Sequence, residues 1–245
     1  SLFYAATGTL VYWLAFRSPA RAFAVKLNGV VAPFFAAVSV LFALLTGFLA
    51  SDVGDRNRQA VRAVTAERDA VLNLDTLSIA SASEMGSIRA ALRAYVAAVV
   101  EDEWSRMAAS ESSQRTDEAM AVLKQEVSDP KIAVESGQAV HNALLNTAIR
   151  IRTARSERLA LSADRTNDLK WATVLILGVL TQVAIGLVHL DRPRAHAAAM
   201  TVFSLAMTIT LSLIALQEHP FNGPLRVMST PIEEALAKMS TGDAP

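Results

Sequence analysis

The sequence predicts an all-α membrane protein with four transmembrane helices and a helical-bundle aqueous domain between spans 2 and 3. Three observations support this fold class. The chain is 52% hydrophobic and only 19% charged. Residues 52–170 hold 18 of the 23 acidic and 16 of the 23 basic residues. Alanine is abundant, and the alternating β-branched pattern of strands is missing. The concentration of charge in one central block of a mostly hydrophobic chain is typical of an integral membrane protein with one sizeable aqueous domain.

Composition also excludes several classes of function. The net charge is zero, which gives no reason to expect a nucleic-acid partner. The chain has no cysteine, so it has no disulfide, thiolate zinc site or cysteine nucleophile. Its four histidines lack metal-ligand spacing: His141, His189, His196 and His219. With no nucleophile–base pair and no glycine-rich phosphate loop, we expect neither an enzyme nor a cofactor.

The apolar segments divide the chain into four parts. Residues 1–50 hold the first two spans. Of these, Leu2–Phe16 is shorter than the ~20 residues that cross a bilayer. We interpret it as an incomplete span, with a cleaved signal peptide as the alternative. Residues 171–216 hold the third and fourth spans, and 217–245 form a C-terminal juxtamembrane tail. The other three spans are predicted at Val30–Ala50, Trp171–Val188 and Ala197–Leu216.

Residues 51–170 are predicted to form the aqueous bundle. Its first helix continues without a strong stop from the second span to Leu77, because Gly54 is a lone glycine. Apolar residues at helical spacing predict further helices at about 88–108, from Thr116 to Val127, and over 131–170. The two short loops carry five Lys or Arg residues, against ten near the membrane on the domain side. This asymmetry predicts that the bundle and the C-terminus are cytoplasmic.

The second span has two faces at 100° per residue. Phe34, Val38 and Phe42 lie on the bulky face. A row of small residues lies on the other, and small residues let membrane helices approach closely. The third span carries a similar row. We therefore predict helix packing at Ala43, Gly47, Gly54, Gly178 and Gly186.

Four segments resemble the bestrophin-like family of integral membrane proteins. They are LFALLTGF at 41–48, the acid-and-arginine segment at 66–72, LRAYVAAVVEDEW at 92–104 and PFNGPLRV at 220–227. The resemblance covers nearly the whole chain. No dense acidic cluster of the bestrophin calcium-clasp kind stands beside the spans.

The resemblance implies a homo-oligomer around a central axis, with a pentamer favoured and a tetramer as the alternative. It also implies that inorganic ions pass the bilayer along the second span. Phe34, Val38 and Phe42 have the i, i+4, i+8 spacing of a pore neck, although such a face can equally meet lipid. Polar residues at or past the end of the span would then line the pore: Thr46, Asp52, Asp55 and Arg56. The alternative for Asp52, Asp55 and Arg56 is an ordinary solvated helix exit. The alternative for Thr46, which lies within the span, is a hydroxyl group that bonds back to its own helix.

A function of another class stays open. The protein can be a membrane-anchored sensory or scaffolding module whose bundle binds a ligand or partner. Polar residues of the bundle can form a buried network or a ligand site, and a structural network is the commoner outcome. These residues are Glu67, Asp69, Arg93, Tyr95 and 101–104. We expect the arginines at 150, 152, 155 and 158 to lie on a solvated face.

Overall fold

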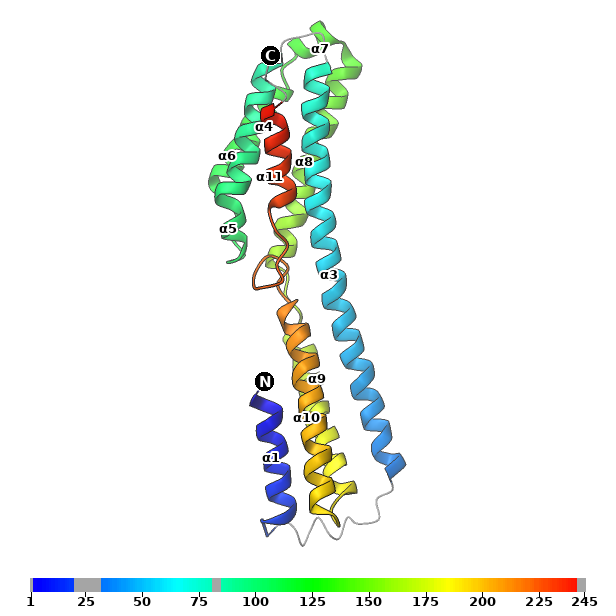
Figure 1. Ribbon diagram of the computed structural model, residues 1–245. Helices are drawn as coiled ribbons and strands as arrows, with labels where there is room; N and C mark the ends of the chain where they lie inside the picture. The colour runs from blue at the N-terminus through cyan, green and yellow to red at the C-terminus, as the bar shows by residue number, and fades with distance from the viewer. Residues whose placement is uncertain (1, 20–31, 81–84, 242–245) are drawn as a thin grey trace. The chain divides into compact units, whose positions relative to one another are not determined.

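The computed structural model describes residues 2–19, 32–80 and 85–241, and all regular structure in these ranges is helical (Figure 1). The side chains of residues 2, 32–35 and 241 are outside the description. The chain divides into two compact units. One comprises Ser1–Asp55 and Arg165–Glu218, and the other comprises Arg56–Asp164 and His219–Pro245.

The first unit contains α1 (Leu2–Phe16), the start of α3, α9 (Asp168–Val188) and α10 (Pro193–Leu216). A buried amide joins three of these helices. Gln182 Nε2 donates to Tyr4 O at 3.0 Å and to Ser204 Oγ at 3.0 Å, while Thr7 Oγ1 donates to Gln182 Oε1 at 2.6 Å. Such bonds hold helices together where apolar burial does not distinguish helix from lipid.

The second unit contains the rest of α3 and the helices of the predicted bundle. They are α4 (Gly86–Ala98), the π-helix η1 (Val99–Glu103), α5 (Trp104–Met107), α6 (Gln114–Val127), α7 (Lys131–Ser136), α8 (Gln138–Ala163) and α11 (Thr230–Thr241). Ser113 caps α6 by accepting a hydrogen bond from Thr116 N at 3.1 Å.

Helix α3 (Ala32–Ala80) is a single helix of 49 residues, as the sequence predicts, and Gly54 does not interrupt it. The start of the predicted second span, Val30 and Val31, lies outside the described residues. Within them, α3, α9 and α10 are long and apolar enough to cross a bilayer, whereas α1 is shorter. The count of four spans therefore stays a prediction.

Two predicted boundaries differ from the structure. The helix predicted over 131–170 is broken at Gly137, whose φ of 85° suits glycine, and again where Asp164 turns extended and Asn167 caps α9. The C-terminal segment, predicted as a juxtamembrane tail, packs into the second unit. Phe221, Ile232 and Met239 are buried in the core of the second unit.

Candidate functional site

One side of α3 is packed inside the first unit. Phe42 is 3% exposed, and its ring centroid lies 6.0 Å from that of Phe203 on α10. Leu49 and Val53 are buried on the same side. Within this chain, Phe42 therefore packs against a neighbouring helix, and its place in a pore neck stays a prediction. Val38 is half-buried, and the side chain of Phe34 is not described.

The opposite side of α3 carries bulky apolar residues that the chain leaves uncovered. Val40, Leu44 and Phe48 are 65%, 52% and 61% exposed. We call these three residues the open stripe. Their spacing of i, i+4, i+8 is the same as that predicted for the neck, but on another side of the helix. The spacing of the apolar residues alone could not show which side of α3 the rest of the chain would cover.

The predicted packing residues fall into two groups. Gly178 and Gly186 are contact sites: a Cβ on Gly178 would lie 2.1 Å from Tyr4 Oη, and one on Gly186 would lie 2.9 Å from Val11 Cγ1. Small residues there let α1 approach α9. The other three lie in different surroundings. Ala43 is exposed, Gly54 is half-buried, and a Cβ on Gly47 would meet nothing within 4 Å.

The residues predicted to line the polar part of the pore also differ in burial. Thr46 is buried, and its Oγ1 has no hydrogen-bond partner among the described residues. Arg56 is buried as well, and its Nε lies 3.1 Å from Asp164 Oδ2. Both side chains are thus buried within this chain, and their place along a pore stays a prediction. Asp55 is exposed, and Asp52 accepts from Lys170 Nζ at 2.8 Å.

A cavity of about 520 Å³ flanks the open stripe between α3 and α9. Its apolar wall includes Leu45, Phe48 and Val174, and its polar end includes Asp52, Asp55 and Lys170. The cavity therefore joins one residue of the open stripe to the charges that follow it on α3.

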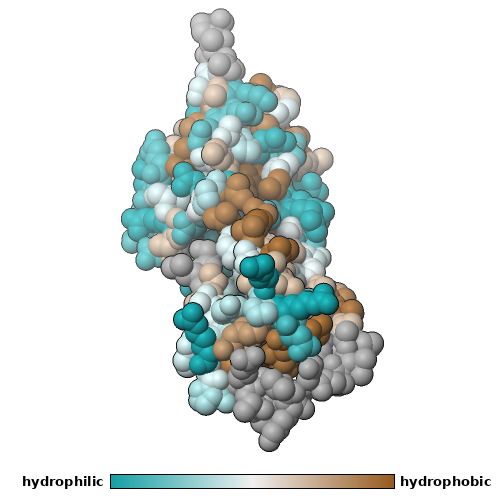
Figure 2. Space-filling view, turned by 60° about the horizontal axis from the view of Figure 1, so that its bottom comes forward, coloured by the Kyte–Doolittle hydropathy of each residue, from teal (hydrophilic) through white to brown (hydrophobic). Residues whose placement is uncertain are grey.

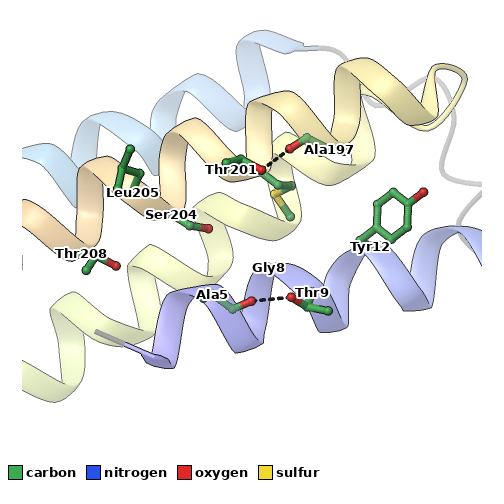
Figure 3. A pocket seen from close by; sticks show the side chains of 10 residues that line it. Ala5, Gly8, Thr9, Tyr12, Ala197, Thr201, Ser204, Leu205 and Thr208 are labelled. Atoms are coloured by element: carbon green, nitrogen blue, oxygen red, sulfur yellow. Dashed lines mark hydrogen bonds between the residues drawn. The ribbon is translucent and has the colours of Figure 1, made fainter.

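A second cavity of about 500 Å³ lies between α1 and α10 (Figure 3). Its hydroxyl groups are largely used within the protein. Thr9 Oγ1 donates to Ala5 O at 2.7 Å, and Thr201 Oγ1 donates to Ala197 O at 2.8 Å. Back-bonded hydroxyls of this kind satisfy themselves in a membrane helix, so this cavity offers few polar groups to a ligand.

The second unit holds a buried ion network. Arg158 is 0% exposed and donates to Glu67 Oε2 at 2.6 Å, to Glu67 Oε1 at 3.1 Å and to Glu103 Oε1 at 2.7 Å. Arg155 also donates to Glu103, and Tyr95 donates to Glu67. The two buried carboxylates thus meet two guanidinium groups, and Arg155 also pairs with the more exposed Asp117 at 2.7 Å.

Electrostatics in the network follow from this pairing. Burial raises the pKa of Tyr95 well above its ordinary value, and the Glu67 carboxylate raises it further. Burial alone would lower the pKa of Arg158, but Glu67 outweighs it and the pKa is raised. Arg158 therefore stays charged at every physiological pH, and Tyr95 stays neutral.

The π-helix places Glu103 in this network. It inserts into the α4–α5 helix over Val99–Glu103, and Glu103 is 0% exposed. The predicted network is thus correct for Glu67, Tyr95 and Glu103. It is wrong for Asp69, which pairs with its neighbour Arg68, and for Arg93, which donates to Met239 O at 2.7 Å.

The predicted solvated arginine face is also only partly correct. Arg150 and Arg152 are exposed, whereas Arg155 and Arg158 are buried in the network. One feature of the sequence indicates that Arg155 and Arg158 are buried: together with Leu161 they recur at helical spacing among buried residues. Among the described residues, no group of three or more His, Cys, Asp or Glu is placed to hold a metal ion.

Comparison with known proteins decides the family. A bestrophin-like domain matches residues 2–232. The chain belongs to the bestrophin-like family. The resemblance noted in the sequence is thereby confirmed. No curated protein matches the chain.

Solved structures agree with the bestrophin-like fold. Three crystal structures of a bacterial bestrophin homologue from Klebsiella pneumoniae, two of them of point variants, superpose with TM-scores of 0.72, 0.75 and 0.71. Their sequence identities are 18%, 16% and 18%. The aligned region covers 98–100% of this chain and 98–99% of theirs. At this identity the match establishes the fold.

Proposed function

We propose that this bestrophin-like protein is a homo-oligomeric ion channel with α3 lining the pore. The observation that carries the proposal is the open stripe. Val40, Leu44 and Phe48 stand one helical turn apart and are left uncovered, while the opposite side of α3 is packed against its own chain. Copies arranged around an axis would bring these residues together as stacked apolar rings, which gate ions by dewetting.

This proposal moves the neck from the position suggested by spacing alone. Phe42 is held by Phe203, so Phe42 would have to leave the core to reach a pore. Beyond the stripe, α3 continues with exposed Ser51, Asp55 and Arg58. In a ring these would form the polar exit of the pore, where charged side chains select ions.

The remaining parts of the proposal follow from the sequence. The protein crosses the cell membrane in four spans, and a pentamer is favoured over a tetramer. The bundle and C-terminus face the cytoplasm, because Lys and Arg gather on that side. Its partners are lipid, inorganic ions and further copies of itself. The alternative of a ligand-binding bundle has less support, because Glu67, Glu103, Arg155 and Arg158 are already paired with one another.

Planar-bilayer recording of the purified protein tests conduction. We expect ion currents, and Phe48→Ala should widen the neck and raise the unitary conductance. Leu205→Ala is the matched control, because Leu205 is an equally exposed apolar residue on α10. Absence of current in the parent and in Phe48→Ala would reject the channel. Equal effects of the two variants would reject the open stripe as its neck.

Topology and subunit number have separate tests. The chain has no cysteine, so a single Val134→Cys variant reports only on the bundle. Val134 is 86% exposed on α7, and a membrane-impermeant thiol reagent should label it only after the cytoplasmic side is opened. Native mass spectrometry of the purified protein gives the subunit number.

A further inference from the structure

The cavity of about 520 Å³ between α3 and α9 crosses the point where both helices change from apolar to charged sequence. All of its lining residues belong to the first unit. On α3, Leu45 and Leu49 precede Asp52, and on α9, Lys170 precedes Val174. The hydrogen bond of 2.8 Å from Lys170 to Asp52 brings the charged ends of the two helices together. Hydrophobic and hydrophilic residues also adjoin on the face of the molecule drawn in Figure 2. The cavity thus has an apolar wall and a polar end.

The polar end of the cavity lies at the level of a bilayer surface. Trp171 follows Lys170 directly, is half-buried, and donates from Nε1 to Glu218 Oε1 at 3.0 Å. Tryptophan side chains with an apolar ring and a bonded N–H gather where hydrocarbon meets water. From Leu45 to Asp52, α3 rises by about 10 Å, which exceeds the headgroup layer of about 5–7 Å on each side of the hydrocarbon core. The cavity therefore extends from the headgroup layer into the hydrocarbon core.

The polar end carries charges of both signs. Two carboxylates, Asp52 and Asp55, line it together with the Lys170 ammonium group. Lys170 Nζ has three N–H donors, and the side chain is 54% exposed while one donor bonds Asp52. A phosphate can therefore reach Lys170, and a cationic group can reach Asp55, which is exposed. A headgroup that is only anionic matches this end poorly, because the carboxylates outnumber the ammonium group.

The rest of the cavity wall offers a ligand few hydrogen bonds. Thr173 lies in the wall, but its Oγ1 donates to Leu169 O of its own helix at 2.7 Å. Leu45, Phe48 and Val174 supply apolar surface. A cavity of this volume is in the range that binds organic ligands. The wall thus suits a hydrocarbon chain, and the polar end suits a zwitterion.

We propose that the cavity between α3 and α9 is a binding site for a phosphatidylethanolamine lipid. One acyl chain lies along Leu45 and Val174, the phosphate meets Lys170, and the headgroup ammonium meets Asp55. The ethanolamine ammonium has N–H donors for a carboxylate, whereas the choline group of phosphatidylcholine has none. The site therefore selects ethanolamine over choline, and both over an anionic headgroup. This binding function is separate from conduction, because its measurement needs no current.

Native mass spectrometry of the purified protein tests the site. The protein is titrated with dioleoyl phosphatidylethanolamine, phosphatidylcholine or phosphatidylglycerol, and the lipid-bound fraction is measured. We expect phosphatidylethanolamine to bind about threefold tighter than phosphatidylcholine, which is the effect of one exposed charge pair. Asp55→Asn should remove this preference, whereas Lys170→Gln should weaken the binding of both lipids about threefold. Asp168→Asn is the matched control and should bind as the parent does, because Asp168 is an exposed acid of α9 outside the cavity wall.

Filling the cavity tests its position. Thr173→Trp places a large ring in the cavity and should abolish lipid retention, whereas Ile176→Trp should bind as the parent does. Ile176 is 59% exposed on the same helix and lies outside the cavity wall. Parental binding by Thr173→Trp would reject the location. Equal binding of the three lipids by the parent, or tighter binding of phosphatidylglycerol, would reject the zwitterionic site. A parent that retains none of the lipids would overturn the proposal, and loss of subunits in Thr173→Trp would then assign the cavity to a second copy of the chain.

Discussion

Arg158→Met should destabilise the bundle strongly. The substitution removes the cation that neutralises Glu67, which is 0% exposed. Breaking a buried ion pair by removing one partner costs about 3–5 kcal/mol. Glu103 is affected less, because Arg155 still contacts it. For a protein of this size the unfolding midpoint should fall by about 10 °C.

Thermal unfolding in detergent, followed by tryptophan fluorescence, measures this loss. Arg152→Met on the exposed side of α8 is the matched control and should shift stability by about 0.5 kcal/mol at most. Adding Glu67→Gln to Arg158→Met removes the unpaired charge while keeping an acceptor for Tyr95. The double variant should recover about 2 kcal/mol. Additive losses, or a loss below about 1 kcal/mol in Arg158→Met, would refute a buried, charge-balanced network.

Four further substitutions have defined outcomes. In thermal melts, Gly178→Ala should lower the free energy of unfolding by about 1–3 kcal/mol, because its methyl group would overlap Tyr4. Gly47→Ala should be neutral, because a Cβ there would meet no described atom within 4 Å. The raised pKa of Tyr95 means that the unfolded state ionises first, so stability should fall as pH rises above about 10. Tyr95→Phe should remove this part of the pH dependence of the melting temperature. Ser113→Ala should cost about 1 kcal/mol in the same melts through loss of its cap; an unchanged midpoint would contradict the capping role.

The long α3 and the apolar helices could be predicted from the sequence because both depend on local patterns. Runs of apolar residues predict the apolar helices, and the absence of a helix stop predicts the length of α3. The open stripe could not be predicted, since Phe34, Val38 and Phe42 and the stripe residues share one spacing. The choice between the two sides depends on Phe203, a contact made by a residue far along the chain.

The ion network was only half predictable for a related reason. Acidic residues in an apolar helical pattern, such as Glu67, indicate burial with a partner. The partner arginines could not be chosen, because Arg150, Arg152, Arg155 and Arg158 are alike in type and close in sequence. Their exposure is decided by which side of α8 faces α3 and the π-helix.

The π-helix makes one short segment unusually sensitive to chain length. A π-turn holds about one residue more than an α-turn, and each α-helical residue turns the chain by about 100°. Deleting one residue within Val99–Glu103 would close the wide turn to a regular α-turn. The residues inside the turn would shift by one position, which takes the Glu103 carboxylate away from Arg158. Homologous chains that keep this network should therefore vary in length in the turn at 108–113 and not here.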